Sequence, residues 1–154
     1  ESDSDNITIS ADENTASAAL AAVDDNSSET VISGADTPTK ATGTWTDEKS
    51  EDFTVDPNGR CTYIGTTVKY LTIDLVATLL MATGLATPCF VYIAVNGNIV
   101  ASTRVTLSVS ALLSATVNTI WGRSFTNGDY IEVFVANELN VANIILQRAV
   151  LRIG

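Results

Sequence analysis

Three stretches decide the fold: FVYIAVNGNIVASTRVTLSV (90–109), TIWGRSFTNGDYIEVFVAN (119–137) and IILQRAVLRI (144–153). In the first two, an Asn-Gly pair (96–97 and 127–128) separates runs rich in β-branched and aromatic residues. Asn-Gly supplies the positive φ angles that a tight hairpin turn needs. The stretches therefore predict antiparallel strands and an all-β domain.

Working outward from these stretches, short strands recur at regular spacing from Gly43 to the end of the chain. We expect them at about 43–46, 52–55, 60–64, 67–76, 89–95, 98–109, 116–124, 129–136 and 143–153. That number of short strands suits a sandwich of two sheets. At 154 residues the chain has room for one such domain and can bury a core without a metal or a disulfide.

Two of the expected strands are apolar on both faces. In 129–136, Ile131, Val133 and Val135 alternate with Tyr130, Glu132, Phe134 and Ala136, and 89–95 shows the same split between aliphatic and aromatic faces. If the aliphatic face lines the core, the aromatic face points outward and needs a second cover. Either the chain's own loops and arm or a neighbouring subunit would supply that cover.

The order of several short motifs resembles that of TNF-like jelly rolls, a fold shared by complement-type globular heads and by trimeric knobs of tailed-phage particles. These motifs are Phe53 before a DPNG turn (56–59), RCTYIG (60–65), the Asn96-Gly97 hairpin, and GDY (128–130) followed by a closing strand. The stretch TPTKATGTW (37–45) is similar to the entry of phage versions of this module. The resemblance implies a homotrimer, and we expect its interface to contain the aromatic residues Phe90, Tyr92, Trp121, Tyr130 and Phe134.

The charge is distributed unevenly along the chain. Residues 1–56 hold fourteen Asp and Glu against two Lys, a charge of −12, whereas residues 57–154 hold four acids against six Lys and Arg, a charge of +2. We therefore predict an acidic N-terminal arm (1–36), a linker (37–42) and a jelly-roll domain (43–154). Repulsion between the acidic arm and phosphates argues against a nucleic-acid partner.

Within the arm, NITIS (6–10) is a candidate strand, and residues 16–23 are a candidate helix after a weak capping box of Ser10 and Glu13. A segment this acidic and this poor in large apolar residues does not usually fold alone, so we expect the arm to dock against a partner. Its apolar anchors would be Ile7, Ile9, Leu20, Val23, Val31 and Ile32.

The residue content argues against catalysis and cofactors. The chain has no His, which removes imidazole-based nucleophile activation and the commonest zinc ligand. Asp129 and Glu132 are better explained as a turn residue and an outward strand residue than as a catalytic pair. The acidic clusters Asp3-Asp5-Asn6 and Asp24-Asp25-Asn26 lack the Gly and Glu positions of a calcium loop. We expect no catalytic, cofactor or metal site.

Three further features have two readings each. The uncharged segment 75–103 is interrupted by turn residues, which fits two buried strands rather than a membrane span, so we expect no membrane partner. Cys61 and Cys89 are either small buried hydrophobic residues or a disulfide. Trp45 and Trp121 either pack inside the protein or present a surface that could stack on sugar rings.

The resemblance to phage modules, together with the lack of catalytic residues, implies a non-enzymatic virion structural protein of a phage or virus. It would be a capsid decoration or cement protein, or the knob of a short fibre, assembled in the host cytoplasm. It would trimerise through the sandwich and bind a capsid or other virion protein through the arm. A receptor- or glycan-binding module of a viral fibre is the main alternative. A secreted ligand of the complement or TNF type is a third hypothesis.

Overall fold

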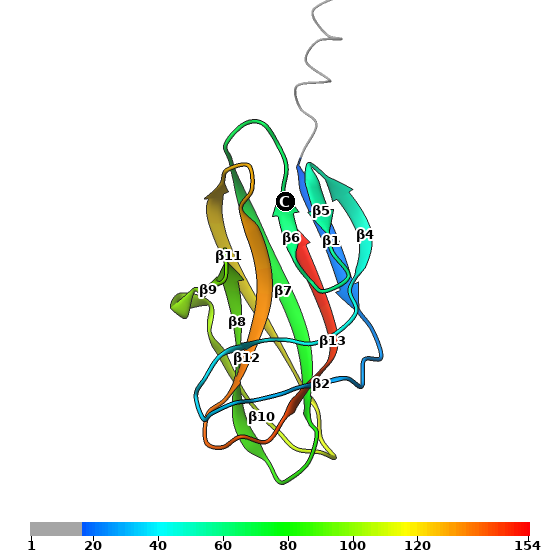
Figure 1. Ribbon diagram of the computed structural model, residues 1–154, viewed down its shortest axis with the longest axis vertical. Coiled ribbons are helices and arrows are strands. Elements are labelled where there is room, and N and C mark those ends of the chain that lie inside the picture. The colour runs from blue at the N-terminus through cyan, green and yellow to red at the C-terminus, as the bar shows by residue number, and fades with distance from the viewer. Residues whose placement is uncertain (1–16) are drawn as a thin grey trace, which may run out of the picture.

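The computed structural model describes residues 17–154 as a sandwich of two antiparallel β-sheets (Figure 1). Sheet A contains, in spatial order, β11 (Ala115–Phe125), β7 (Lys69–Met81), β13 (Ile144–Ile153), β1 (Ala18–Val23) and β4 (Thr46–Glu51), with β2 (Glu29–Thr30) also paired to β13. Sheet B contains β10 (Val105–Val109), β8 (Thr87–Val95), β12 (Tyr130–Asn137), β6 (Cys61–Tyr63) and β5 (Phe53–Val55), with β3 (Thr39–Lys40) beside β12 and β9 (Asn98–Ile99) beside β8.

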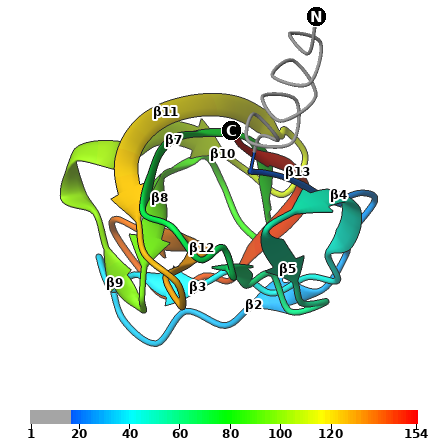
Figure 2. The ribbon, with the colours of Figure 1, turned by 90° about the horizontal axis from the view of Figure 1, so that it is seen from above.

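The core lies between the two sheets, as the view along the strands shows (Figure 2). The aliphatic faces predicted for β8 and β12 both point into it, so that alternation is confirmed. At one end the core is aromatic: the ring centroid of Phe125 lies 5.7 Å from that of Phe53 and 6.0 Å from that of Tyr63. The buried Tyr63 hydroxyl donates a 2.6 Å hydrogen bond to the Thr67 carbonyl. This pairing removes the penalty of an unsatisfied buried hydroxyl.

The predicted strands from 52 onward match the observed strands, with two exceptions. β7 continues to Met81, five residues beyond the expected strand 67–76. The expected strand 98–109 is divided into β9, the 3₁₀ turn η1 (Ala101–Thr103) and β10. Thr103 explains the division, because its buried hydroxyl accepts a hydrogen bond from the Ile93 amide and donates one to the Val100 carbonyl. The turn at 96–97 has positive φ at both Asn96 and Gly97, whereas at 127–128 the φ angle is positive at Gly128.

The predicted boundary between arm and domain is wrong for residues 17–42. Residues 18–23, expected as part of a helix, form β1, which is hydrogen-bonded on both sides, to β13 and to β4. Ala favours helices, but here Ala19, Ala21 and Val23 alternate into the core, so tertiary packing overrides the local propensity. The expected linker contains β3. The candidate strand 6–10, Ile7 and Ile9 lie outside the described residues.

Both cysteines are free and buried. Cys61 belongs to the core near Asp47 and Asp56, and burial together with these negative charges raises the pKa of its thiol to about 12. Burial raises the pKa of Cys89 to about 11, and its Sγ lies 3.6 Å from the Sδ of Met81. These thiols therefore behave as small hydrophobic side chains of the core.

We expect neither cysteine of the native protein to react with iodoacetamide at mildly alkaline pH. The thiolate is the reactive form, and pKa values this high leave it well below about one part in a hundred there. Mass spectrometry should detect no label on the folded protein and two labels after unfolding without reductant. An unlabelled mass two hydrogens lighter would instead reveal a disulfide.

Candidate assembly interface on sheet A

The five aromatic residues expected at an oligomer interface do not share one surface. Phe90 and Tyr92 lie on the outward side of sheet B but are only 5% and 4% exposed within the single chain. Their rings pack edge to face at 6.1 Å, and the Arg104 guanidinium lies over the Phe90 ring. The chain itself therefore covers this aromatic cluster, and the two residues have little surface left for a neighbour.

The other three residues of that group are partly buried in different surroundings. Phe134 packs against the Phe90 and Tyr92 cluster. Tyr130 lies under the Arg60 guanidinium, which is 3.9 Å from the ring centroid. Trp121 belongs to sheet A, where it packs against the main core. A role for these residues in an interface stays a prediction.

The anchor residues expected on the arm are also dispersed. Val23 and Ile32 are buried in the core, so neither can contact a partner. Val31 is exposed, and Leu20 is half-buried on the outward side of β1. Among the four anchors in the described residues, Leu20 and Val31 thus remain able to contact another molecule.

Sheet A, in contrast, carries exposed and half-buried aliphatic side chains on its outward face, in two adjacent rows. Val76 and Val150 lie in one row, and Leu20 and Ile120 lie in the other, on either side of Arg152 and Asp74. The register places Ala22 of β1 opposite Val150 of β13, and Val150 opposite Val76 of β7. In the single chain, Val76 is 39% exposed, Val150 40% and Ile120 of β11 62%. Together with Leu20, these side chains form what we call the sheet A face. Exposed aliphatic side chains gathered on one face of a sheet make that face a candidate interaction site.

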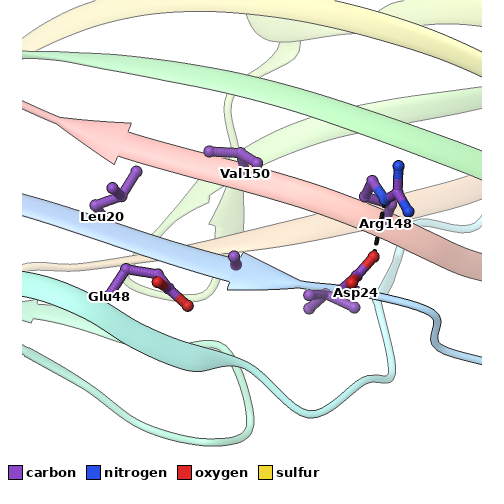
Figure 3. A pocket seen from close by; sticks show the side chains of 7 residues that line it. Leu20, Asp24, Glu48, Arg148 and Val150 are labelled. Atoms are coloured by element: carbon purple, nitrogen blue, oxygen red, sulfur yellow. Dashed lines mark hydrogen bonds and ion pairs between the residues drawn. The ribbon is translucent and has the colours of Figure 1, made fainter.

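Two depressions lie beside these aliphatic side chains. Leu20 and Val150 line a depression of about 490 Å³ whose rim includes Asp24, Glu48 and Arg148 (Figure 3). The same two side chains line a second depression of about 300 Å³ on the side of β7, together with Val76. A partner side chain could fill either hollow, and both walls are largely aliphatic.

Charged side chains lie among these aliphatic ones and pair with one another. Arg152 lies 3.1 Å from the Asp74 carboxylate, which also accepts a 2.7 Å hydrogen bond from Asn118. Arg148 pairs with Asp24 at 2.9 Å. Exposed pairs of this kind add little stability, but they leave an almost neutral face that another protein surface can cover without a large electrostatic cost.

Tyr70 extends the face toward β11. It is largely exposed, and its ring lies across Gly122, where a Cβ atom would come within 2.6 Å of the tyrosine hydroxyl oxygen. The missing side chain at Gly122 therefore lets the ring lie against the sheet. Sequence reasoning missed the sheet A face, although the alternation in KYLTIDLVA (69–77) and RAVLR (148–152) already places Val76 and Val150 on the polar side of their strands.

The carboxylates considered for catalysis have structural partners. Asp129 accepts hydrogen bonds from the Thr126 amide and the Asn96 side chain and lies 3.3 Å from Arg123, thereby linking two hairpin turns. Partial burial acts to raise its pKa, but these three partners outweigh it and lower the pKa below the ordinary value of 3.8. Glu132 is buried between Lys40 at 2.9 Å and Arg60 at 3.2 Å. It thereby ties β3 and β6 to β12.

The residues from 17 onward contain no cluster of three or more His, Cys, Asp or Glu that could hold a metal ion. In the same part of the chain, no helix is long and apolar enough to cross a membrane.

Comparison with solved structures identifies the fold. Murine APRIL superimposes with a TM-score of 0.52 and 12% identity over 88% of this chain and 98% of its own. The PRD1 vertex protein P5 superimposes with a TM-score of 0.53 and 10% identity over 89% of this chain and 94% of its own. No protein-family model and no curated sequence matches the chain. At these identities the likeness shows the fold alone, a TNF-like jelly roll, as the order of the sequence motifs predicts.

Proposed function

We propose that this protein is a non-enzymatic structural component of a phage or virus particle, a capsid decoration or cement protein or the knob of a short fibre, and that it acts as a homotrimer. The sheet A face carries the proposal, because exposed aliphatic side chains gathered on one face of a sheet are typical of an interface. TNF-like modules are typically trimers, and the likeness to a viral vertex protein supports a place in a virion.

The sheet A face suits contact with a second copy of the chain. The charges that lie among its aliphatic side chains are paired, Arg152 with Asp74 and Arg148 with Asp24, so a second copy could cover the face without burying either pair unmatched. A ring of three subunits closes when the face of one copy meets a different surface of the next. On this proposal the interface lies on sheet A rather than on the aromatic side of sheet B.

Attachment to the particle is assigned to residues 1–16, which carry five of the chain's acids together with Ile7 and Ile9. They precede Ser17, which lies at the end of the sandwich where its hydroxyl donates to Asp52. The docking role predicted for residues 1–36 is thereby restricted to the part that precedes β1.

Deleting residues 1–16 is expected to leave a folded trimer that no longer cosediments with assembled particles. Deleting residues 1–36 is expected to prevent folding, because it removes β1 from between β13 and β4. Circular dichroism reports the folding and cosedimentation reports the attachment. If salt weakens the attachment of the wild type, the acidic residues are responsible for binding. If attachment persists in salt, binding depends on Ile7 and Ile9. If the variant that lacks residues 1–16 still attaches fully, the docking site lies on the sandwich and not on these residues.

The described tryptophans give glycan binding little support. Trp45 is buried against the DPNG turn, where a Cβ atom at Gly59 would lie 2.5 Å from the indole Nε1. Trp121 packs against the core. Burial leaves Trp45 no ring face that could stack on a sugar, and Trp121 is partly covered. Reproducible binding on a glycan array, without binding to particles, would favour the receptor-binding alternative.

A further inference from the structure

A pocket lined almost entirely by polar groups lies on the outward side of sheet A. Its volume is about 280 Å³, near the lower end of the usual range for ligand sites. Its lining residues, from the loop after β1, from β7, from β11 with the residue before it, and from β13, are Asp25, Thr78, Ser114, Thr116, Gln147 and Arg148. We call it the polar pocket. It borders the sheet A face, because Thr78 follows Val76 on the same side of β7.

A β-bulge in β13 brings two consecutive side chains to this pocket. The pairing of β13 with β7 shifts between Leu146 and Arg148, so Gln147 is an extra residue with no partner in β7. Consecutive side chains of a regular strand point to opposite faces, but Gln147 and Arg148 both line the pocket. Bulges redirect side chains in this way and are common next to functional sites.

Hydrogen bonds hold the loop after β1 beside the bulge. The Asn26 amide donates to the Gln147 carbonyl at 3.0 Å, and the Asn26 side chain donates to the Leu146 carbonyl at 2.9 Å. Asp25, the preceding residue, has a φ angle of 52°, in the left-handed region. Residues other than glycine seldom adopt this conformation, although Asp and Asn do so more readily than most. The fold thus accepts a backbone cost that brings a carboxylate to the pocket.

The pocket presents donors and acceptors that the protein itself does not use. In the described part of the chain, the side chains of Asp25, Ser114 and Gln147 form no hydrogen bond or ion pair. Thr78 and Thr116 lie opposite each other in β7 and β11, and their hydroxyl oxygens are 2.7 Å apart. Only one of these two hydroxyls donates to the other, so the second proton is left for a ligand. A carboxylate that only accepts therefore lies beside an amide and hydroxyls that both donate and accept.

The charges around the pocket favour a neutral ligand. Arg148 is paired with Asp24 at 2.9 Å (Figure 3), and Asp25 adds a negative charge that has no cation of its own. An anion such as phosphate would be repelled by this carboxylate. One unpaired carboxylate is also too few for a metal ion, in agreement with the lack of a metal-binding cluster in residues 17–154.

We propose that the polar pocket binds one ring of a neutral saccharide, whose hydroxyls bond to Asp25 and Gln147. Neighbouring hydroxyls of a sugar ring each donate and accept, so they match a carboxylate, an amide and hydroxyls gathered in a pocket of this size. The site uses neither Trp45 nor Trp121. It goes beyond the structural role proposed above, and it is complete within one chain, so it does not depend on the trimer.

The test is a glycan array probed with the full chain, followed by NMR titration with the free saccharide of each glycan that binds. Asp25→Asn should weaken binding about tenfold and Gln147→Ala about fivefold, because a hydrogen bond to a charged group contributes more than one between neutral groups. Asparagine tolerates the left-handed conformation, so the first variant retains the backbone. Asp36→Asn is the matched control, since Asp36 is exposed, lies outside the pocket and also has a φ angle of 52°. It should bind like the wild type.

Light scattering on the same samples separates this proposal from the trimer proposal. A trimer that binds no saccharide would overturn the pocket assignment alone, whereas a monomer that binds one would overturn the trimer alone. Binding that is unchanged in both Asp25→Asn and Gln147→Ala would place the saccharide elsewhere and also overturn the assignment. Binding limited to sialylated or sulfated glycans and abolished by salt would contradict a neutral ligand.

Discussion

Val76→Asp is expected to convert the trimer into monomers that remain folded. Val76 lies on the sheet A face opposite Val150 and Asn118, and the two arginines of that face, Arg148 and Arg152, are already paired with Asp24 and Asp74. In the single chain the side chain is partly exposed, so the aspartate can be hydrated there. At a closed interface it would be buried without a partner, which costs at least about 2 kcal/mol per contact, roughly thirtyfold in affinity. Sedimentation velocity gives the oligomeric state.

Two matched variants make this result specific to sheet A. Val68→Asp introduces the same charge at an exposed valine outside the sheet A face and should leave the trimer intact. Phe134→Asp tests the aromatic side of sheet B, where the sequence alone placed the interface. If Phe134→Asp dissociates the trimer and Val76→Asp does not, the interface lies on sheet B and the assignment made here is reversed.

Phe125→Ala is expected to lower the free energy of unfolding by about 3–5 kcal/mol, the usual cost of emptying the space of a buried phenylalanine. Phe125 is fully buried, and its ring packs edge-on against Phe53 and Tyr63. It ends β11, so it also closes the core at one edge of sheet A. Denaturant unfolding followed by tryptophan fluorescence measures the change.

That measurement needs a fixed protein concentration, because dissociation of an oligomer adds to the apparent stability. Carrying out the substitution in the Val76→Asp background removes this contribution. Phe125→Leu, which retains most of the volume, should cost clearly less than the alanine variant. Equal losses for leucine and alanine would show that the aromatic contacts, rather than the filled volume, stabilise this end of the core.

The sequence predicted the strands best where alternation and turn residues agree. IEVFVA (131–136) alternates cleanly, and Gly128 and Asn96-Gly97 mark the turns, so the positions of β8, β12 and β13 were expected to within two residues. The order of these motifs also pointed to the TNF-like jelly roll. The boundaries of a strand such as 98–109 depend on a single side chain, Thr103, whose backbone hydrogen bonds no local pattern predicts.

The prediction for the N-terminal region was wrong because amino-acid composition indicates how soluble a segment is but does not say where the segment lies in the fold. AALAAV (18–23) has the helix propensity of alanine, and its acidic surroundings suggest a solvated arm. Its small side chains instead suit a strand packed closely between β13 and β4, with alternate residues in the core. Such a pairing spans more than a hundred residues of sequence, and local patterns do not contain it.

The prediction of an interface on the aromatic side of sheet B rested on residue type, which does not give the exposure of a side chain. Large aromatic side chains on the outward side of β8 suggested a neighbour, but Phe90 and Tyr92 cover each other with help from Arg104. The more exposed aliphatic side chains of sheet A are Leu20, Val76, Ile120 and Val150, contributed by four strands. Each is unremarkable in its own strand, and only the pairing of the strands brings the four onto one face.

The mass of the wild-type protein in solution tests the central claim most directly. Static light scattering across a dilution series up to high micromolar concentration should give three times 16.2 kDa. A mass of 16.2 kDa that persists at the highest concentration would contradict the account, since the sheet A face would then remain uncovered by other copies of the chain.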